Sequence, residues 1–177
     1  MVTTTKTYRK GRPVIYQSGD KVVHPNHGGC VIKGVSTREI GGKTRRYYVL
    51  VPKSDPNTTI LDPVEGIQKI GLQDIISAEQ ADEILAYAAD VETGWIKENA
   101  KRKLEYAAIL KEGSFNDVAR MIKELMLQAQ RVSLNQGDRI LLQNAQKKLL
   151  SVIALAKDIN LEQASGQMNE ALQLDVS

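Results

Sequence analysis

The chain has 177 residues, of which 42% are hydrophobic and 25% are charged, a balance typical of globular proteins that excludes wholesale disorder. No stretch approaches the ~20 apolar residues of a membrane-spanning helix, and residues 1–10 lack the apolar core of a secretory signal. The only cysteine, Cys30, cannot form an internal disulfide, which fits a reducing compartment. We therefore expect one or two domains and a cytoplasmic location.

The net charge of +3 is unevenly distributed along the chain. Residues 1–13 contain four basic and no acidic residues, residues 14–94 eight basic and eleven acidic, residues 95–150 eleven and six, and residues 151–177 one and four. Two basic blocks indicate either a surface that faces a polyanion or solvated helix faces, and charge alone leaves both open. We interpret residues 1–13 as a mobile basic arm, which is functional or merely an extension.

Residues 14–75 predict a small β domain. Gly41-Gly42 joins two β-rich runs, which is typical of a hairpin with a primed turn. Five short strands in so few residues predict a strongly bent sheet or partly open barrel. Such a sheet keeps an exposed edge that is either protected or used to add a partner strand. The predicted strands are Lys21–His24, Cys30–Thr37, Lys43–Val51, Thr58–Leu61 and Ile67–Ile70.

Residues 77–177 predict a bundle of about five helices, so the fold class is α+β. Capping residues at Ser77, Ser114, Asn135 and Asn160 mark four helix starts. The second helix is predicted from Trp95 to Glu112, with Gly113 as its stop. The predicted helices span about 78–90 and 95–112, a third follows the cap at Ser114, a fourth follows the cap at Asn135, and a shorter fifth runs from Asn160 through Leu172. Apolar positions are expected at Leu104, Ala107, Ala108 and Leu110 on the second helix, and at Val118, Ile122, Leu125 and Ala129 on the third.

Two constellations suggest chemistry. His24, His27 and Cys30 are possible zinc ligands, but no further His or Cys is available, so we favour a polar turn between strands over a zinc-dependent enzyme. No phosphate-binding glycine loop and no nucleophile elbow is found. Trp95, preceded by Gly94 and followed by basic residues, either packs in a helix seam or is exposed to wedge between bases while Lys and Arg neutralise phosphates.

Several segments resemble the CarD/CdnL family of bacterial transcription regulators, which bind RNA polymerase and share their N-terminal module with the transcription-repair coupling factor. The resemblance covers roughly residues 15–160. It begins with a fairly specific opening motif, Gly19-Asp20-Lys21-Val22-Val23-His24-Pro25-Asn26-His27-Gly28. It continues through the Gly41-Gly42 hairpin, Tyr47–Val51 and Gly71–Ile75, and resumes at Trp95 and Gly113–Val118.

The resemblance implies a Tudor-like N-terminal domain that adds a strand to the RNA polymerase β subunit. It also implies a helical domain on promoter DNA, with a Trp wedged into the minor groove near the −10 region to stabilise the open complex. Trp95 matches that Trp, Lys97 matches a basic neighbour, and Arg38 matches a basic polymerase contact. Leu61-Asp62 stands where the family often has a basic residue, and residues 1–13 have no counterpart.

The leading hypothesis is therefore a non-enzymatic transcription regulator without cofactor or metal. Its expected polymerase-binding residues are Arg38, Thr59, Ile60 and Leu61, and its expected DNA-binding residues are Trp95, Lys97, Lys101, Arg102 and Lys103. The alternative is a protein–protein adapter that uses the same sheet edge without touching DNA.

Overall fold

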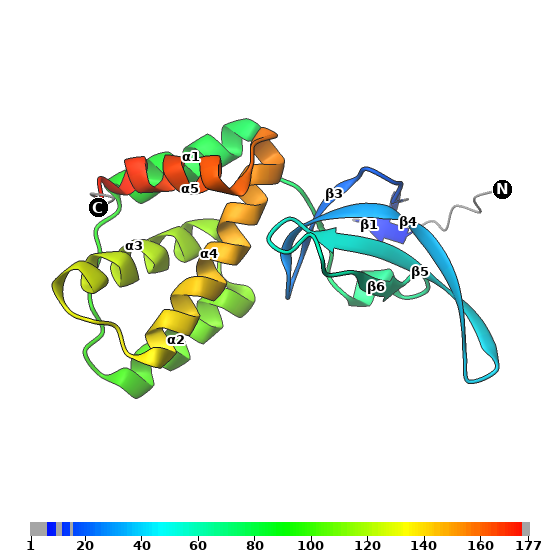
Figure 1. Ribbon diagram of the computed structural model, residues 1–177, viewed down its shortest axis with the longest axis horizontal. Coiled ribbons are helices and arrows are strands. Elements are labelled where there is room, and N and C mark those ends of the chain that lie inside the picture. The colour runs from blue at the N-terminus through cyan, green and yellow to red at the C-terminus, as the bar shows by residue number, and fades with distance from the viewer. Residues whose placement is uncertain (1–6, 10–11, 15, 175–177) are drawn as a thin grey trace. The chain divides into compact units, whose positions relative to one another are not determined.

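The computed structural model describes residues 7–9, 12–14 and 16–174, and the chain divides into two compact units, Met1–Ile75 and Ile76–Ser177 (Figure 1). The first unit is built from strands and the second from helices, so the predicted α+β class is confirmed. No helix in the described part of the chain is long and apolar enough to cross a membrane.

The first unit contains a five-stranded antiparallel sheet that is not closed into a barrel. Its strand order is β6-β5-β4-β3-β7, so β6 and β7 form the two edges. A short separate hairpin, β1 with β2, begins in the segment interpreted as an arm and ends at Val14, one residue beyond it. The strands are β1 Thr7–Arg9, β2 Arg12–Val14, β3 Lys21–His24, β4 Gly28–Ile40, β5 Lys43–Pro52, β6 Ile60–Pro63 and β7 Gln73–Asp74.

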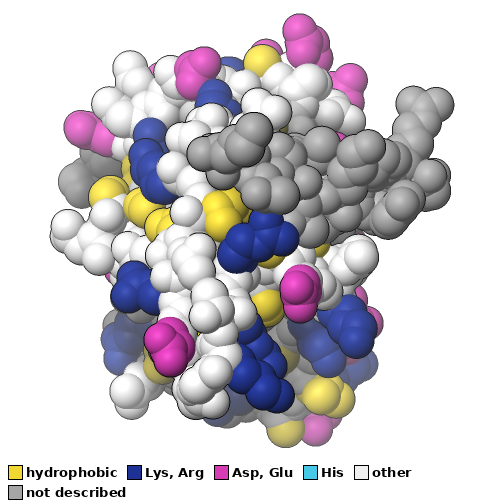
Figure 2. All heavy atoms as spheres, turned by 90° about the vertical axis from the view of Figure 1, so that its right-hand side faces the viewer, with side chains coloured by type: hydrophobic (Ala, Val, Ile, Leu, Met, Phe, Trp, Pro, Cys, Tyr) yellow, Lys and Arg dark blue, Asp and Glu magenta, His cyan; other side chains and the backbone are white. Residues whose placement is uncertain are grey.

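The long β4–β5 hairpin projects beyond the rest of the sheet (Figure 1). Gly41 and Gly42 form its turn with φ of 60° and 71°, the left-handed pair that a primed turn requires. On one face of the sheet, alternate residues form the core of the unit, namely Val22, Cys30, Ile32, Tyr48 and Leu50, joined by Val64 and Ile67. In Figure 2, where the right-hand side of Figure 1 faces the viewer, Lys and Arg side chains gather in the lower part of the surface.

Three details of the predicted sheet are wrong. The fifth predicted strand, Ile67–Ile70, is instead a 3-10 helix, η1 Ile67–Lys69, because Gly66 turns the chain with a left-handed φ of 85°. The fourth strand starts at Ile60 rather than Thr58 and continues through Pro63. Strand β7 carries no apolar alternation and was not predicted.

The second unit packs five helices around one core, as predicted. Ser77, Ser114 and Asn160 each close a capping box, and Asn135 accepts a hydrogen bond from the backbone of Asp138. The buried core includes Ala81, Ile84, Leu85, Ala88, Val118, Met121, Ile122, Leu125, Ala145, Leu149, Ile153 and Met168. The helices are α1 Ala78–Asp90, α2 Asn99–Glu112, α3 Phe115–Arg131, α4 Gln136–Lys157 and α5 Leu161–Leu172.

The second helix differs most from its prediction. Helix α2 begins at Asn99 rather than Trp95, and its buried residues are Arg102 and Tyr106. Leu104, predicted as buried, is 74% exposed, and Ala107 and Ala108 are also exposed. Ala129, predicted on the buried stripe of α3, is exposed as well.

Candidate functional site

Trp95 lies in the connection between α1 and α2. The chain is extended at both ends of this connection, at Val91 (φ −62°, ψ 131°) and at Glu98 (φ −71°, ψ 115°). Trp95 is the only Trp of the chain. It is partly exposed and packs, with Ile96, against the helical core. The sequence left open whether Trp95 packs between helices or is exposed. The indole does both in part, because it packs on the helical core and still presents surface to solvent.

Arg102 of α2 holds this connection in place through its side chain. Its side chain is only 4% exposed and forms a bidentate ion pair with Asp138, through Nε to Oδ1 at 3.0 Å and Nη2 to Oδ2 at 2.7 Å. Nη1 donates to the carbonyl of Ile96 at 2.7 Å. The guanidinium carbon lies 4.3 Å from the centroid of the Trp95 ring, within cation–π range.

This geometry corrects the predicted role of Arg102 as a DNA contact. Its charge is neutralised by Asp138, and its donors already serve Asp138, the Ile96 carbonyl and Asn99 Oδ1. A guanidinium with no free donor edge cannot also take a phosphate. Arg102 instead holds the backbone and ring of the Trp95 segment.

Glu124 of α3 holds the same connection at a second point, the amide of Gly94. It is 5% exposed and accepts three hydrogen bonds, from the Gly94 amide at 3.4 Å, from Arg120 at 3.0 Å and from the Tyr106 hydroxyl at 2.8 Å. Burial, followed by the hydrogen bond to this carboxylate, raises the pKa of Tyr106 well above its usual range. The partners of Glu124 and Asp138 in this site, Gly94, Tyr106 and Arg102, lie 18 or more residues away in the sequence. Only Arg120 and Asn135 are near neighbours, so the local sequence does not reveal the role of either carboxylate.

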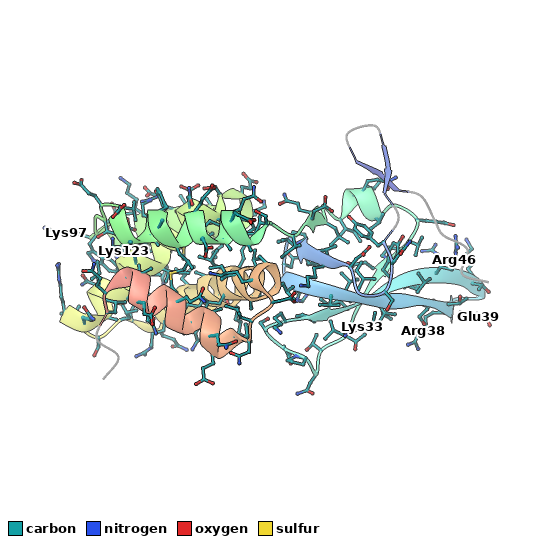
Figure 3. All side chains as sticks on the ribbon, turned by 90° about the horizontal axis from the view of Figure 1, so that it is seen from above. Lys33, Arg38, Glu39, Arg46, Lys97 and Lys123 are labelled. Atoms are coloured by element: carbon teal, nitrogen blue, oxygen red, sulfur yellow. The ribbon has the colours of Figure 1, made fainter. Side chains whose placement is uncertain are left out.

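Lys123 provides a third attachment. Its Nζ donates to the carbonyls of Ala89 and Val91, both at 2.9 Å, and so satisfies carbonyls that the end of α1 leaves without helical partners. Figure 3 shows Lys123 and Lys97 at one end of the helical unit. The connection that bears Trp95 is therefore tied to α2 and α3 at residues 91, 94 and 96.

Three of the predicted basic residues are exposed near this connection. Lys97, Lys101 and Lys103 are all exposed. Lys101 and Lys103 flank Arg102 on either side of the buried face of α2, since each helical residue turns by about 100°. Of these three, only Lys101 forms an ion pair with a described residue, Glu105 at 3.8 Å, and an exposed pair of this kind holds its partners weakly.

The predicted polymerase-binding residues lie in two places in the first unit. Ile60 and Leu61 belong to the edge strand β6, Ile60 half-buried against the core and Leu61 37% exposed. Thr59 is exposed and directly precedes the strand. Arg38 lies on the β4–β5 hairpin, opposite Arg45, beyond the part of β5 with which β6 pairs.

Comparison with known proteins matches each of the two units to a protein family. The family model described as the CarD-like/TRCF RID domain matches residues 16–76, and the model described as the CarD C-terminal domain matches residues 83–169. The chain belongs to the CarD family. It is also 24% identical over 149 residues to a Bacillus subtilis (strain 168) protein named "Putative transcription factor YdeB", covering 84% of this chain and 97% of that protein.

Membership of the CarD family, together with the name of this relative, supports the conclusion that the chain is a transcription regulator. CarD-like domains also imply an interaction with RNA polymerase in general. These matches concern families of regulators rather than of enzymes.

The opening motif of this CarD-like domain forms a tight polar turn. His24 and Asp62 are buried, with Nε2 and Oδ2 3.4 Å apart, and His24 Nδ1 accepts the Asn26 amide at 3.0 Å. Burial, followed by the charge of Asp62, raises the pKa of Cys30 to about 12, so its thiol is a poor metal ligand at neutral pH. Within the described residues, no three His, Cys, Asp or Glu side chains are grouped to hold a metal ion, which leaves the zinc alternative unsupported.

Asp62 thus has a structural explanation. Its side chain turns to the core side of the sheet beside His24, while Leu61 alone of the two faces outward. Of the two residues that stand where the family often has a basic one, only the apolar Leu61 therefore lies at the exposed edge.

Proposed function

We propose that this CarD-family protein binds the β subunit of RNA polymerase through the edge of its sheet and stabilises the promoter open complex through Trp95. It acts by binding rather than by catalysis, in the cytoplasm where transcription takes place. The observation that carries the proposal is Trp95 itself, a partly exposed indole whose segment is held by Arg102 and Glu124 and is followed by the exposed Lys97, Lys101 and Lys103.

Docking by strand addition is supported by the backbone of β6. The Val64 amide donates to the Arg46 carbonyl at 3.0 Å, and since alternate residues of a strand bond to the same neighbour, residues 60 and 62 also face β5. Leu61 and Pro63 consequently direct their backbone groups away from the sheet. An added strand of the β subunit would pair with the amide and carbonyl of Leu61.

DNA contact through Trp95 is supported by its surroundings. An indole inserted at an unstacked base step needs a rigid base, because the energy of unstacking is offset only if the ring does not yield. Arg102, Glu124 and Lys123 supply that rigidity, and Lys97, Lys101 and Lys103 would neutralise phosphates beside it. Such a wedge senses deformability more than base identity, so we expect weak affinity for isolated DNA.

The test is the lifetime of the open complex formed by RNA polymerase on a promoter, with the full chain added. Trp95→Ala should shorten this lifetime several-fold towards that of polymerase alone, while Trp95→Phe, which keeps an aromatic wedge, should retain most of the effect. Both variants should still bind polymerase. If Trp95→Ala prolongs the lifetime as well as the parent protein, the wedge is refuted.

A protein–protein adapter is the second candidate, and the outer side of α2 favours it. Leu104, Ala107 and Ala108 form an exposed apolar row of the kind that a partner helix covers. Reactivity of promoter thymines to permanganate separates the candidates. An adapter leaves the reactivity of the melted region unchanged, whereas the proposed wedge increases or extends it.

A further inference from the structure

The turn that joins β3 to β4 brings the two histidines of the chain together. Its residues, Pro25, Asn26 and His27, are exposed and lie between His24 at the end of β3 and Gly28 at the start of β4. The His27 amide donates to the His24 carbonyl at 3.3 Å. The two imidazole rings are in contact, with their centroids 4.8 Å apart. The proposed function does not use this turn.

The partners of His24 define where its proton lies. Its Nδ1 accepts the backbone amide of Asn26 at 3.0 Å, so this nitrogen presents a lone pair. The proton of the neutral ring is therefore on Nε2, which lies 3.4 Å from Asp62 Oδ2. The side chains of His24 and Asp62 are only 5% and 10% exposed, so these contacts replace water for both groups.

The hydrogen bond from Asn26 makes the His24 imidazole part of the turn. A side-chain acceptor that takes the amide two residues on is the arrangement of an Asx turn, which Asn and Asp form with an oxygen. Unlike such an oxygen, Nδ1 becomes a donor when the ring takes up a second proton. The protonated Nδ1 and the Asn26 amide would then face each other as two donors, so this proton and the hydrogen bond exclude one another.

Asp62 determines which part of the structure moves. Among the described residues, no group donates a hydrogen bond to its Oδ2, although this oxygen is buried. A doubly protonated His24 would carry a positive charge beside this carboxylate, and the attraction between opposite charges at such a distance is strong in a buried site. The ring is therefore retained beside Asp62, and the exposed turn is the part that opens.

A proton on His27 acts on the same turn. Burial, followed by the charge of His24, lowers the pKa of His27 below 6.5, whereas the charge of Asp62 opposes this shift. In an opened turn His27 takes up its proton near pH 6.5, and in the closed turn only at lower pH. The open form therefore binds more protons below pH 6.5, and the closed turn loses stability as the pH falls.

The other titratable groups that face Asp62 keep their protons in mild acid. Cys30 of β4 has a pKa of about 12. Tyr48 of β5 lies directly opposite Asp62, and burial raises the pKa of its hydroxyl above the usual range. Both groups are therefore neutral near pH 6, and the two histidines are the groups around Asp62 that respond to mild acid.

The charged residues of the neighbouring strands do not replace Asp62. Arg46 and Asp20 act on Tyr48 with opposite signs, and the Asp20 carboxylate accepts a backbone amide at 2.8 Å. Lys53, directly after β5, donates its amide to the Gly29 carbonyl at 2.9 Å and adds a cation rather than an anion. Of the described charges, that of Asp62 raises the pKa of His27, so the two imidazoles share one carboxylate.

We propose that the turn Pro25–His27 is an acid-operated switch, in which a proton taken up by His24 or His27 releases the Asn26 amide and opens the turn while Asp62 retains the His24 ring. The switch belongs to the sheet unit and does not depend on the proposed function. It converts mild acidification into a change in the conformation of an exposed loop.

NMR spectroscopy of the full chain between about pH 7.5 and pH 5 tests the switch, because the chain has only two histidines and each imidazole can be followed separately. Protection of the Asn26 amide from hydrogen exchange, corrected for the intrinsic rate, should fall about tenfold with the midpoint of one imidazole. The Ile32 amide, which donates to the Asp20 carbonyl at 2.8 Å, should keep its protection within about twofold. If the imidazoles titrate while the protection of Asn26 stays constant, the switch is refuted.

His24→Asn separates the imidazole from the rest of the turn. The Asn oxygen can still accept the Asn26 amide as in an Asx turn, but it does not titrate, so the protection of Asn26 should become independent of pH. An equal fall in this variant would show that another group opens the turn and would overturn the proposal. Asp62→Asn should move the titration of His27 to lower pH, because the charge of Asp62 raises its pKa. An unchanged titration contradicts the shared carboxylate.

His27→Gln keeps the proposal testable if His24→Asn does not fold, since it alters an exposed residue. Opening that follows the His24 titration in this variant assigns the proton to His24, and a turn that stays closed assigns it to His27. Either result supports the switch. Opening that follows neither imidazole overturns it.

Discussion

Replacing Arg102 with Met should cost the helical unit much of its stability. Asp138 is 2% exposed in its side chain and is paired with Arg102 through two hydrogen bonds. Met has good helix propensity and similar length, so the main change is a buried carboxylate without its cation. Removing one partner of a buried pair costs about 3–5 kcal/mol, a large part of the roughly 5–15 kcal/mol that stabilises a domain.

Thermal denaturation of the full chain followed by Trp fluorescence measures this loss directly. Because Trp95 is the only Trp, the signal reports the unit that contains Arg102. For a unit of roughly this size, each kcal/mol lowers the melting temperature by about 4–8 °C, so Arg102→Met should lower it by at least about 12 °C. Below the transition, the native emission should also change, since the guanidinium no longer covers one face of the indole.

Two further variants make the reasoning refutable. Lys101→Met, on the exposed side of the same helix, should change stability by only about 0.5 kcal/mol or less. Adding Asp138→Asn to Arg102→Met should restore part of the loss, because the orphaned charge disappears while the hydrogen bond from the residue 138 amide to Asn135 remains. If Arg102→Met lowers the melting temperature no more than Lys101→Met, the buried ion pair does not stabilise the unit.

Four other predictions follow from local geometry. Ser114→Ala should lower stability by about 1 kcal/mol, measured by urea denaturation, because the helix α3 amide of Asp117 loses its cap. The hydrogen bonds from Ser114 lower the pKa of Asp117 below 3.8, so its stabilising contribution is present above pH 3.8 and is lost as pH falls through the folded-state pKa. When the free energy of unfolding is measured at falling pH, Asp117→Asn should therefore lose stability less steeply than the parent protein. An equally steep loss in the variant would contradict this. Gly113→Ala should destabilise by about 1–3 kcal/mol in thermal melts, because its Cβ would lie 2.6 Å from the Ile109 carbonyl oxygen. Cys30, with a pKa of about 12 and no exposed surface, should resist alkylation at pH 8 until denaturant is added; rapid labelling of the native protein would show that the thiol is accessible.

Features set by neighbouring residues could be predicted from the sequence. The capping residues and the Gly41-Gly42 turn act within three or four positions, so helix starts and the hairpin emerge from short patterns. The strand predicted at Ile67–Ile70 shows the limit of that approach, since this segment begins after a left-handed Gly66 and forms a 3-10 turn instead.

The Trp95 connection could not be predicted, because distant partners determine it. Trp95 and Ile96 fit a helical pattern, yet hydrogen bonds from Arg102 to Ile96 and from Gly94 to Glu124 hold them in a non-helical segment. Hydrophobicity then assigned Leu104 to the buried face of α2, where Arg102 in fact lies because Asp138, 36 residues away, neutralises it. Long-range ion pairs of this kind have no period that a sequence pattern reveals.

Pro63 at the outward side of β6 has a consequence for the behaviour of the free protein. Open sheet edges promote aggregation through the growth of continuous sheets between copies. Here the edge is four residues long, and proline has no amide hydrogen, so of the two outward-facing residues only Leu61 can donate. Two copies laid edge to edge would gain too few bonds to extend a shared sheet. The same strand can therefore stay exposed at high concentration in a crowded cell and still accept one short, correctly registered partner.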